Sequence, residues 1–188
     1  MFDILVACTK KGGIGKDGTI PWYLPPDLKY FRSITMEASD SGAINAVIMG
    51  KNTWYSLPKR PLAGRLNVVL TSSENVEDIT ASGAHVCRSL DEALAYLKGM
   101  ANIEKVFVIG GGRVYEEAIR HPECRYVYAT VIENEYDCDT FFPLERLERD
   151  RSQDGLTIFS SFIMVSFTFG FRYKDIRYEF RKYERTGF

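Results

Sequence analysis

The chain has 188 residues, with 24 basic and 25 acidic side chains and a formal net charge of −1. This length suits one domain with a single core. The balanced charge, without a block of about five like charges, excludes a basic nucleic-acid arm and a polybasic membrane anchor. A small molecule is the favoured partner.

The cysteines and histidines do not form a metal motif, because no Cys-x-x-Cys pair or histidine at metal-ligand spacing is present. They are Cys8, Cys87, Cys124, Cys138, His85 and His121. We therefore expect reduced thiols, no bound metal and a cytoplasmic location. Residues 1–9 lack the features of a secretory signal, and the apolar run 156–171 is interrupted by polar residues, so we expect neither export nor membrane insertion.

Short β-branched runs alternate with helical patterns along the first 132 residues. The predicted strands are Ile4–Thr9, Ala46–Met49, Asn67–Thr71, Ala84–Arg88, Val106–Ile109 and Tyr126–Ile132. The predicted helices are Asp27–Thr35, Asn52–Leu57, Leu90–Lys98 and Val114–Arg120. This alternation indicates an α/β fold with a mostly parallel sheet. Two later runs, Leu156–Phe171 and Ile176–Glu184, have no helix between them and predict an antiparallel hairpin at one edge.

Two predicted strands end in a glycine that leads directly into a helix. Ala46–Gly50 continues into Lys51, and Val106–Gly110 continues into Gly111. Ligands collect at the carboxyl ends of strands in open α/β sheets, and helix N-termini offer free N–H groups to phosphates. The second junction does not match G-x-G-x-x-G, and the chain lacks a Walker A loop. The sequence therefore favours a nucleotide site of another kind.

Asp27 is an isolated acid among the large apolar residues Trp22, Leu24, Leu28 and Phe31. Desolvation in such a setting raises the pKa of a carboxyl group and suits it to proton transfer. The ordinary alternative is a solvated acid in the first turn of a helix, where it interacts favourably with the helix dipole. These residues alone leave both interpretations open.

Six motifs follow one another through nearly the whole chain. They are Gly13–Trp22, Leu24–Phe31, Ala46–Trp54, Arg60–Leu70, Val108–Tyr115 and Asp139–Pro143. In this order they resemble the dihydrofolate reductase family, in which the first two correspond to the mobile active-site loop and the catalytic helix. Each motif alone is weak, but six in the same order are specific.

The resemblance implies an α/β protein with one dihydrofolate reductase domain over residues 1–188. Its central sheet would be mostly parallel and eight-stranded, with an antiparallel C-terminal hairpin and about four flanking helices. The implied reaction reduces 7,8-dihydrofolate to tetrahydrofolate by hydride transfer from NADPH, supplying one-carbon metabolism and thymidylate synthesis. We expect a monomer that binds dihydrofolate and antifolate inhibitors.

The resemblance also implies the substrate site. Asp27 would be the catalytic acid, and Trp22 would hold an ordered water beside it. Arg65 would clamp the α-carboxylate of the glutamate tail with two parallel hydrogen bonds, although a solvated arginine at a strand edge is the ordinary alternative. The rest of the pocket, whose apolar members also suit plain core packing, would be Leu5, Val6, Ala7, Leu28, Phe31, Leu57, Leu62, Ile109, Tyr115 and Thr130.

For the cofactor, the resemblance implies contacts from both glycine junctions and from the active-site loop. The Gly110–Gly111 peptide is expected to be cis, and Lys51, Ser72, Ser73 and Arg88 are candidates for the adenosine 2′-phosphate. The remaining expected contacts are Ala7, Ile14, Gly15, Ile20, Gly50, Asn52, Thr53, Thr71, Ile109, Gly111, Gly112, Arg113, Val114 and Tyr115.

Two other functions remain as alternatives. One is a pyrimidine reductase of riboflavin synthesis with the same fold, which Asp27 and Arg65 argue against. The other is a folate-binding relative without catalysis, which the retained Asp27, Trp22 and glycine loops disfavour. The glycine-rich segment Thr9–Trp22 is expected to act as a lid over the site.

Overall fold

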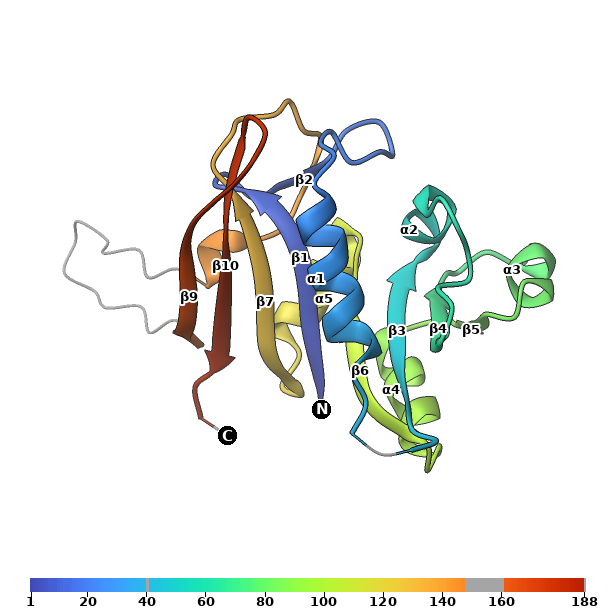
Figure 1. The fold of residues 1–188 in the computed structure, drawn as a ribbon. Helices are drawn as coiled ribbons and strands as arrows, with labels where there is room; N and C mark the ends of the chain where they lie inside the picture. The colour runs from blue at the N-terminus through green and yellow to red at the C-terminus, as the bar shows by residue number, and fades with distance from the viewer. Residues whose placement is uncertain (40, 148–160, 188) are drawn as a thin grey trace, which may run out of the picture.

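The computed structural model describes residues 1–39, 41–147 and 161–187. A twisted eight-stranded sheet forms its centre, and Figure 1 shows α1 in front of this sheet and α4 and α5 behind it. The strand order is β5-β4-β3-β6-β1-β7-β10-β9. Every pair from β5 to β7 is parallel, whereas β10 is antiparallel to both β7 and β9.

The main strands are β1 (Phe2–Thr9), β3 (Ile44–Gly50), β4 (Arg65–Leu70), β5 (His85–Cys87), β6 (Ile103–Val108), β7 (Cys124–Ile132), β9 (Phe162–Tyr173) and β10 (Ile176–Arg185). A second, small sheet pairs β2 (Gly13–Gly15) with β8 (Thr140–Phe141). The helices are α1 (Pro25–Met36), α2 (Lys51–Ser56), α3 (Glu77–Ala81), α4 (Leu90–Lys98) and α5 (Gly112–Arg120), with a 3-10 turn at Leu144–Arg146.

The predicted fold class is confirmed, including the mostly parallel eight-stranded sheet and the C-terminal hairpin. Two features differ from the sequence prediction. The short helix α3 is a fifth α-helix, and its five residues are too few to produce a helical hydrophobic period. The strands β2 and β8 were not predicted because they are only three and two residues long. Of the predicted run Leu156–Phe171, residues 156–160 lie outside the described residues.

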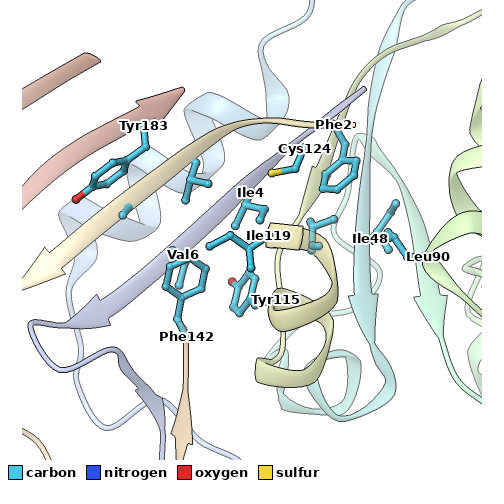
Figure 2. Packing of buried hydrophobic residues seen from close by; sticks show 14 of the residues in the cluster. Phe2, Ile4, Val6, Ile48, Leu90, Tyr115, Ile119, Cys124, Phe142 and Tyr183 are labelled. Atoms are coloured by element: carbon cyan, nitrogen blue, oxygen red, sulfur yellow. The ribbon is translucent and has the colours of Figure 1, made fainter. Parts of the chain in front are cut away.

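Alternation along the strands divides the core between the two faces of the sheet. The larger cluster covers the face that carries α4 and α5, and Figure 2 shows Ile4, Val6, Tyr115, Ile119 and Phe142 packed together there. A second cluster contains Leu5, Phe107, Trp54 and Ile109. Leu5 and Val6 therefore point to opposite faces, and residues of odd number on β1 share the face of α1.

The C-terminal end of α1 is fixed to the sheet by Asn45 of β3, which is 1% exposed. Its Nδ2 donates to the main-chain oxygens of Thr35 at 3.0 Å and Glu37 at 2.9 Å. Its Oδ1 accepts from the main-chain N–H of Lys105 on β6 at 3.1 Å. One buried amide thus joins the helix end and two neighbouring strands. Both its nitrogen and its oxygen have hydrogen-bond partners.

Replacing Asn45 with aspartate tests this attachment. The Asn45→Asp carboxylate cannot donate to the oxygens of Thr35 and Glu37, so we expect the free energy of unfolding to fall by at least about 2 kcal/mol. Urea unfolding followed by circular dichroism measures the change. The matched control is Asn75→Asp at an exposed position, where we expect a change within about 0.5 kcal/mol. Equal stability of the two variants would contradict the assignment.

Candidate active site

Asp27 lies in the first turn of α1, which begins with Pro25 and Pro26. Prolines suit this position because the first helical N–H groups have no partner within the helix. The hydroxyl of Thr130 on β7 donates to Asp27 Oδ1 at 2.6 Å. Burial raises the pKa of the Asp27 carboxyl, while the Thr130 hydrogen bond acts in the opposite direction. The carboxyl is thus partly buried and held by a hydroxyl that is itself buried, an environment that suits proton transfer better than that of a fully solvated first-turn acid.

Aromatic and apolar side chains surround the start of α1. The Trp22 ring lies 5.3 Å from that of Tyr136, and both pack against a small cluster that contains the buried Leu24. Leu28 is 52% exposed on the next turn of the helix. Exposed apolar surface next to a carboxyl group with a raised pKa suits a flat heteroaromatic ligand.

The carboxyl ends of β1 and β6 bring other predicted pocket residues together. Leu5 and Ile109 belong to one buried cluster, against which the predicted pocket residues Phe31, Leu57 and Leu62 pack. The Tyr115 hydroxyl donates to the main-chain oxygen of Leu5 at 2.7 Å. Tyr115 is thereby fixed under the site rather than free to meet a ligand through its hydroxyl.

The predicted pocket member Val6 lies in the other cluster, with Tyr115 and Phe142. Its side chain points away from the face of Asp27, because neighbouring residues of a strand alternate. Only the main chain of Val6 is available to a ligand on the Asp27 face.

Arg65, at the start of β4, lies beside α1. Its Nη1 donates to the Thr35 hydroxyl at 2.7 Å and its Nη2 to the Ala63 oxygen at 3.2 Å. Its Nε is buried and has no hydrogen-bond partner in the described ranges. Burial and the nearby Arg32 lower the pKa of the Arg65 guanidinium, because both disfavour its charge. The exposed part of this partly buried guanidinium, with the charge of Arg32 nearby, is suited to an organic carboxylate.

The two glycine junctions meet at the carboxyl ends of β3 and β6. The N–H of Gly50 donates to the oxygen of Gly110 at 2.8 Å, and the expected cis peptide between Gly110 and Gly111 is confirmed. A Cβ at Gly112 would lie 3.0 Å from the Phe141 oxygen, and one at Gly111 would lie 3.1 Å from Thr53 Oγ1. Both residues are therefore too close to their neighbours to carry a side chain without displacing them.

No side chain caps the N-terminus of α5, which starts after Gly111. Its first N–H groups are therefore available to an anion, and Arg113 is exposed on the same turn. Val114 lies against Gly50 of the other junction, since a Cβ on Gly50 would be 3.2 Å from Val114 Cγ2. These features fit a pyrophosphate group bridging the two junctions.

The candidates for a 2′-phosphate also come together, after β4 and β5. Arg88 Nη1 donates to the main-chain oxygens of Thr71 and Ser73. The Ser73 N–H donates to the Thr71 hydroxyl at 3.1 Å. Arg88 therefore shapes the turn after β4 and places a positive charge next to it, whereas no hydrogen bond to this turn is present from Lys51 in the described residues.

The predicted lid is joined to a second loop that sequence reasoning did not assign to the site. The N–H of Asp139 donates to the Gly15 oxygen at 2.9 Å, and Asp139 Oδ2 accepts from the N–H of Asp17 at 2.8 Å. The N–H of Phe142 donates to the Gly12 oxygen at 2.7 Å. Asp139 stands in one of the six motifs, but its partners are more than a hundred residues away, so no local signal assigned it this role.

In the described part of the chain, no helix combines the length and apolar character needed to cross a membrane. The four cysteines are all free thiols, and the first three are buried: Cys8, Cys87, Cys124 and Cys138.

Comparison with known proteins identifies the family of this chain. Residues 1–153 match the family model described as dihydrofolate reductase. The chain is 41% identical over 144 residues to a dihydrofolate reductase of Heliothis virescens, covering 75% of this chain and 78% of that protein. It is also 45% identical over 190 residues to a bifunctional dihydrofolate reductase-thymidylate synthase of Daucus carota, covering 98% of this chain and 34% of that protein.

A bifunctional dihydrofolate reductase-thymidylate synthase 2 of Arabidopsis thaliana is 48% identical over 147 residues, which are 76% of this chain and 26% of that protein. The match with this chain thus spans about a quarter to a third of the bifunctional relatives and more than three quarters of the insect enzyme. On the family match and the identity to the insect protein, the chain belongs to the dihydrofolate reductase family.

Proposed function

We propose that this protein reduces 7,8-dihydrofolate to tetrahydrofolate with NADPH. The observation that carries the proposal is the Asp27 carboxyl, which is held by Thr130 on the face of α1 and has a raised pKa caused by burial. The family match and the dihydrofolate reductase of Heliothis virescens support the assignment.

Asp27 serves as the proton-delivery group for the pterin. A carboxyl group with a raised pKa keeps its proton at higher pH, which favours protonation of the pterin N5 directly or through the water that Trp22 would hold. Arg65 binds the glutamate tail, because its partly buried guanidinium and the nearby charge of Arg32 attract the carboxylate. The predicted apolar residues between them, Leu28, Phe31, Leu57 and Leu62, line the path from pterin to tail.

NADPH, when bound, supplies the hydride for the pterin C6. The two glycine junctions and the α5 N-terminus hold its pyrophosphate, and Arg88 favours a 2′-phosphate over a free hydroxyl by its charge. The segment Thr9–Trp22, tied to Asp139, closes over the nicotinamide and excludes water.

The remaining expectations accompany this function. We propose one domain over residues 1–188, which is supported by the position of β9 and β10 in the same sheet as β1. The free cysteines favour a reducing compartment such as the cytoplasm. We expect a monomer.

A steady-state assay tests the reaction. NADPH absorbance should fall when dihydrofolate is added, and NADH should be the poorer donor. Turnover of a riboflavin-pathway pyrimidine in place of dihydrofolate would favour the pyrimidine reductase, and tight antifolate binding without turnover would favour a binding relative. A folded protein that does not oxidise NADPH when dihydrofolate is added would refute the proposal.

Substituting asparagine for Asp27 separates proton delivery from folding. Asp27→Asn should lower the hydride-transfer rate at neutral pH by at least about 100-fold, with partial recovery at acidic pH, where solvent protonates N5. The raised pKa of Asp27 means that its stabilising contribution is present at low pH and is lost as the pH rises through that pKa. Asp27→Asn should therefore be the more stable protein at neutral pH, with the difference vanishing in acid.

Stopped-flow kinetics and urea unfolding, each over a range of pH, provide these two measurements. Thr130→Val serves as the comparison, because it removes the hydroxyl and keeps the shape of the side chain. A rate at neutral pH that is unchanged by Asp27→Asn would remove Asp27 from the mechanism.

Removing the Arg65 charge tests the carboxylate site. Arg65→Leu should raise the KM for dihydrofolate by at least about 30-fold, because one member of a buried charge pair is lost. It should leave the KM of a dihydropterin without the glutamate tail nearly unchanged. Arg60→Leu, at an exposed position outside the proposed site, is the control. Equal losses on both substrates would show that Arg65 acts on the fold and not on the tail.

A further inference from the structure

We propose that the closely packed ring pair Tyr30 and Phe180 positions the catalytic carboxyl of Asp27 by pressing α1 against the sheet next to Thr130. Both are positioning residues rather than catalytic residues, because they act through the helix that carries Asp27. The inference rests on the proposed function and adds a role for the C-terminal hairpin in it.

The geometry starts from one cross-strand pair. Thr130 of β7 and Phe180 of β10 lie directly opposite each other in the antiparallel ladder. Thr130 donates its hydrogen bond to Asp27, and the Phe180 ring lies 4.1 Å from that of Tyr30 at an interplanar angle of 31°. Asp27 and Tyr30 are three residues apart and so share one face of α1. A single cross-strand pair therefore holds the helix at two points, one turn apart.

The hairpin supports Phe180 with further rings. Phe171 and Tyr178 each lie 5.6 Å from Phe180, and Phe171 also stacks on Tyr178 at 5.6 Å. Aromatic contacts at these distances contribute beyond the apolar area that they bury. Phe180 is therefore braced by rings from both strands of the hairpin, and its contact with Tyr30 transmits the position of the hairpin to the helix.

The ionisable groups that face Asp27 from the elements packed on it are tyrosines. Burial raises the pKa of Tyr30 on α1, Tyr178 on β10 and Tyr115 on α5, and the Asp27 charge raises each of them further, with Cys8 also contributing at Tyr115. These phenols are neutral at physiological pH. The environment of Asp27 is thus set by how well this aromatic surface excludes water, and by the Thr130 hydrogen bond.

Removing the ring at position 180 should let water reach Asp27. In Phe180→Leu the carboxyl becomes better solvated, so the fall in hydride-transfer rate with rising pH should occur at lower pH. The value of kcat at neutral pH should drop and recover in acid, while the KM for dihydrofolate should change less. Tyr30→Leu removes the other ring of the contact and should shift the pH dependence of the rate to lower pH in the same way.

Two controls separate positioning from general loss of stability. Phe162→Leu removes a buried ring at the other end of the hairpin, where Phe162 packs under Arg185 at 4.6 Å. It should lower stability without moving the pH profile. Tyr30→Phe keeps the ring and removes only the hydroxyl, so it should behave like the parent protein.

The titration of Asp27 can also be followed directly, by carboxyl ¹³C NMR with the signal assigned through its loss in Asp27→Asn. This readout does not need turnover, so it distinguishes failure of the positioning proposal from failure of the proposed reaction. A shift to lower pH in Phe180→Leu and Tyr30→Leu, absent from Phe162→Leu and Tyr30→Phe, is the expected result. An unchanged titration in both leucine variants at 30 and 180, or an equal shift in Phe162→Leu, would overturn the proposal.

Discussion

The hydrogen bond from Thr130 to Asp27 is the contact on which the rest of the site depends. It joins the first helix to the central part of the sheet across 103 residues of sequence, and it fixes the end of α1 that carries the carboxyl. Asn45 fixes the other end. With both ends held, the helix has a fixed position on the face of the sheet that carries Leu5 and Ile109.

The same contact balances two opposing effects on the carboxyl. Burial disfavours the charged form and is the larger effect, while the Thr130 hydroxyl stabilises the charge. Without the hydroxyl the pKa of the carboxyl would be raised further, and in an open site it would be raised less. A few aromatic rings near the site therefore influence the pKa of Asp27 without forming a hydrogen bond to its carboxyl group.

Local patterns were enough to predict much of this arrangement. The strand, glycine and helix sequence at Gly50 and Gly110 predicted both strand-to-helix junctions, and the helix predicted from Asp27 begins two residues earlier, at Pro25. Three sets of contacts were not predicted from local pattern. They are the hydrogen bonds of Arg65, the hydrogen bonds between Asp139 and the loop at Gly15 and Asp17, and the Tyr30–Phe180 ring contact. Each depends on partners brought together by the sheet order, and β-pairing between distant segments leaves no periodic signal in either partner.

The register of β10 decides which side chain meets α1. Phe180 faces Thr130, and by strand alternation Arg181 faces the opposite side with Tyr183, which is buried in the larger core cluster. A slip of one residue would exchange these faces, placing a guanidinium over Tyr30 and turning Phe180 away. The pairing of β10 with β7 runs without interruption from Tyr178 to Glu184, whereas the pairing of β10 with β9 contains two register shifts. The outer strand thus absorbs the irregularity, and the inner pair keeps the geometry that Asp27 requires.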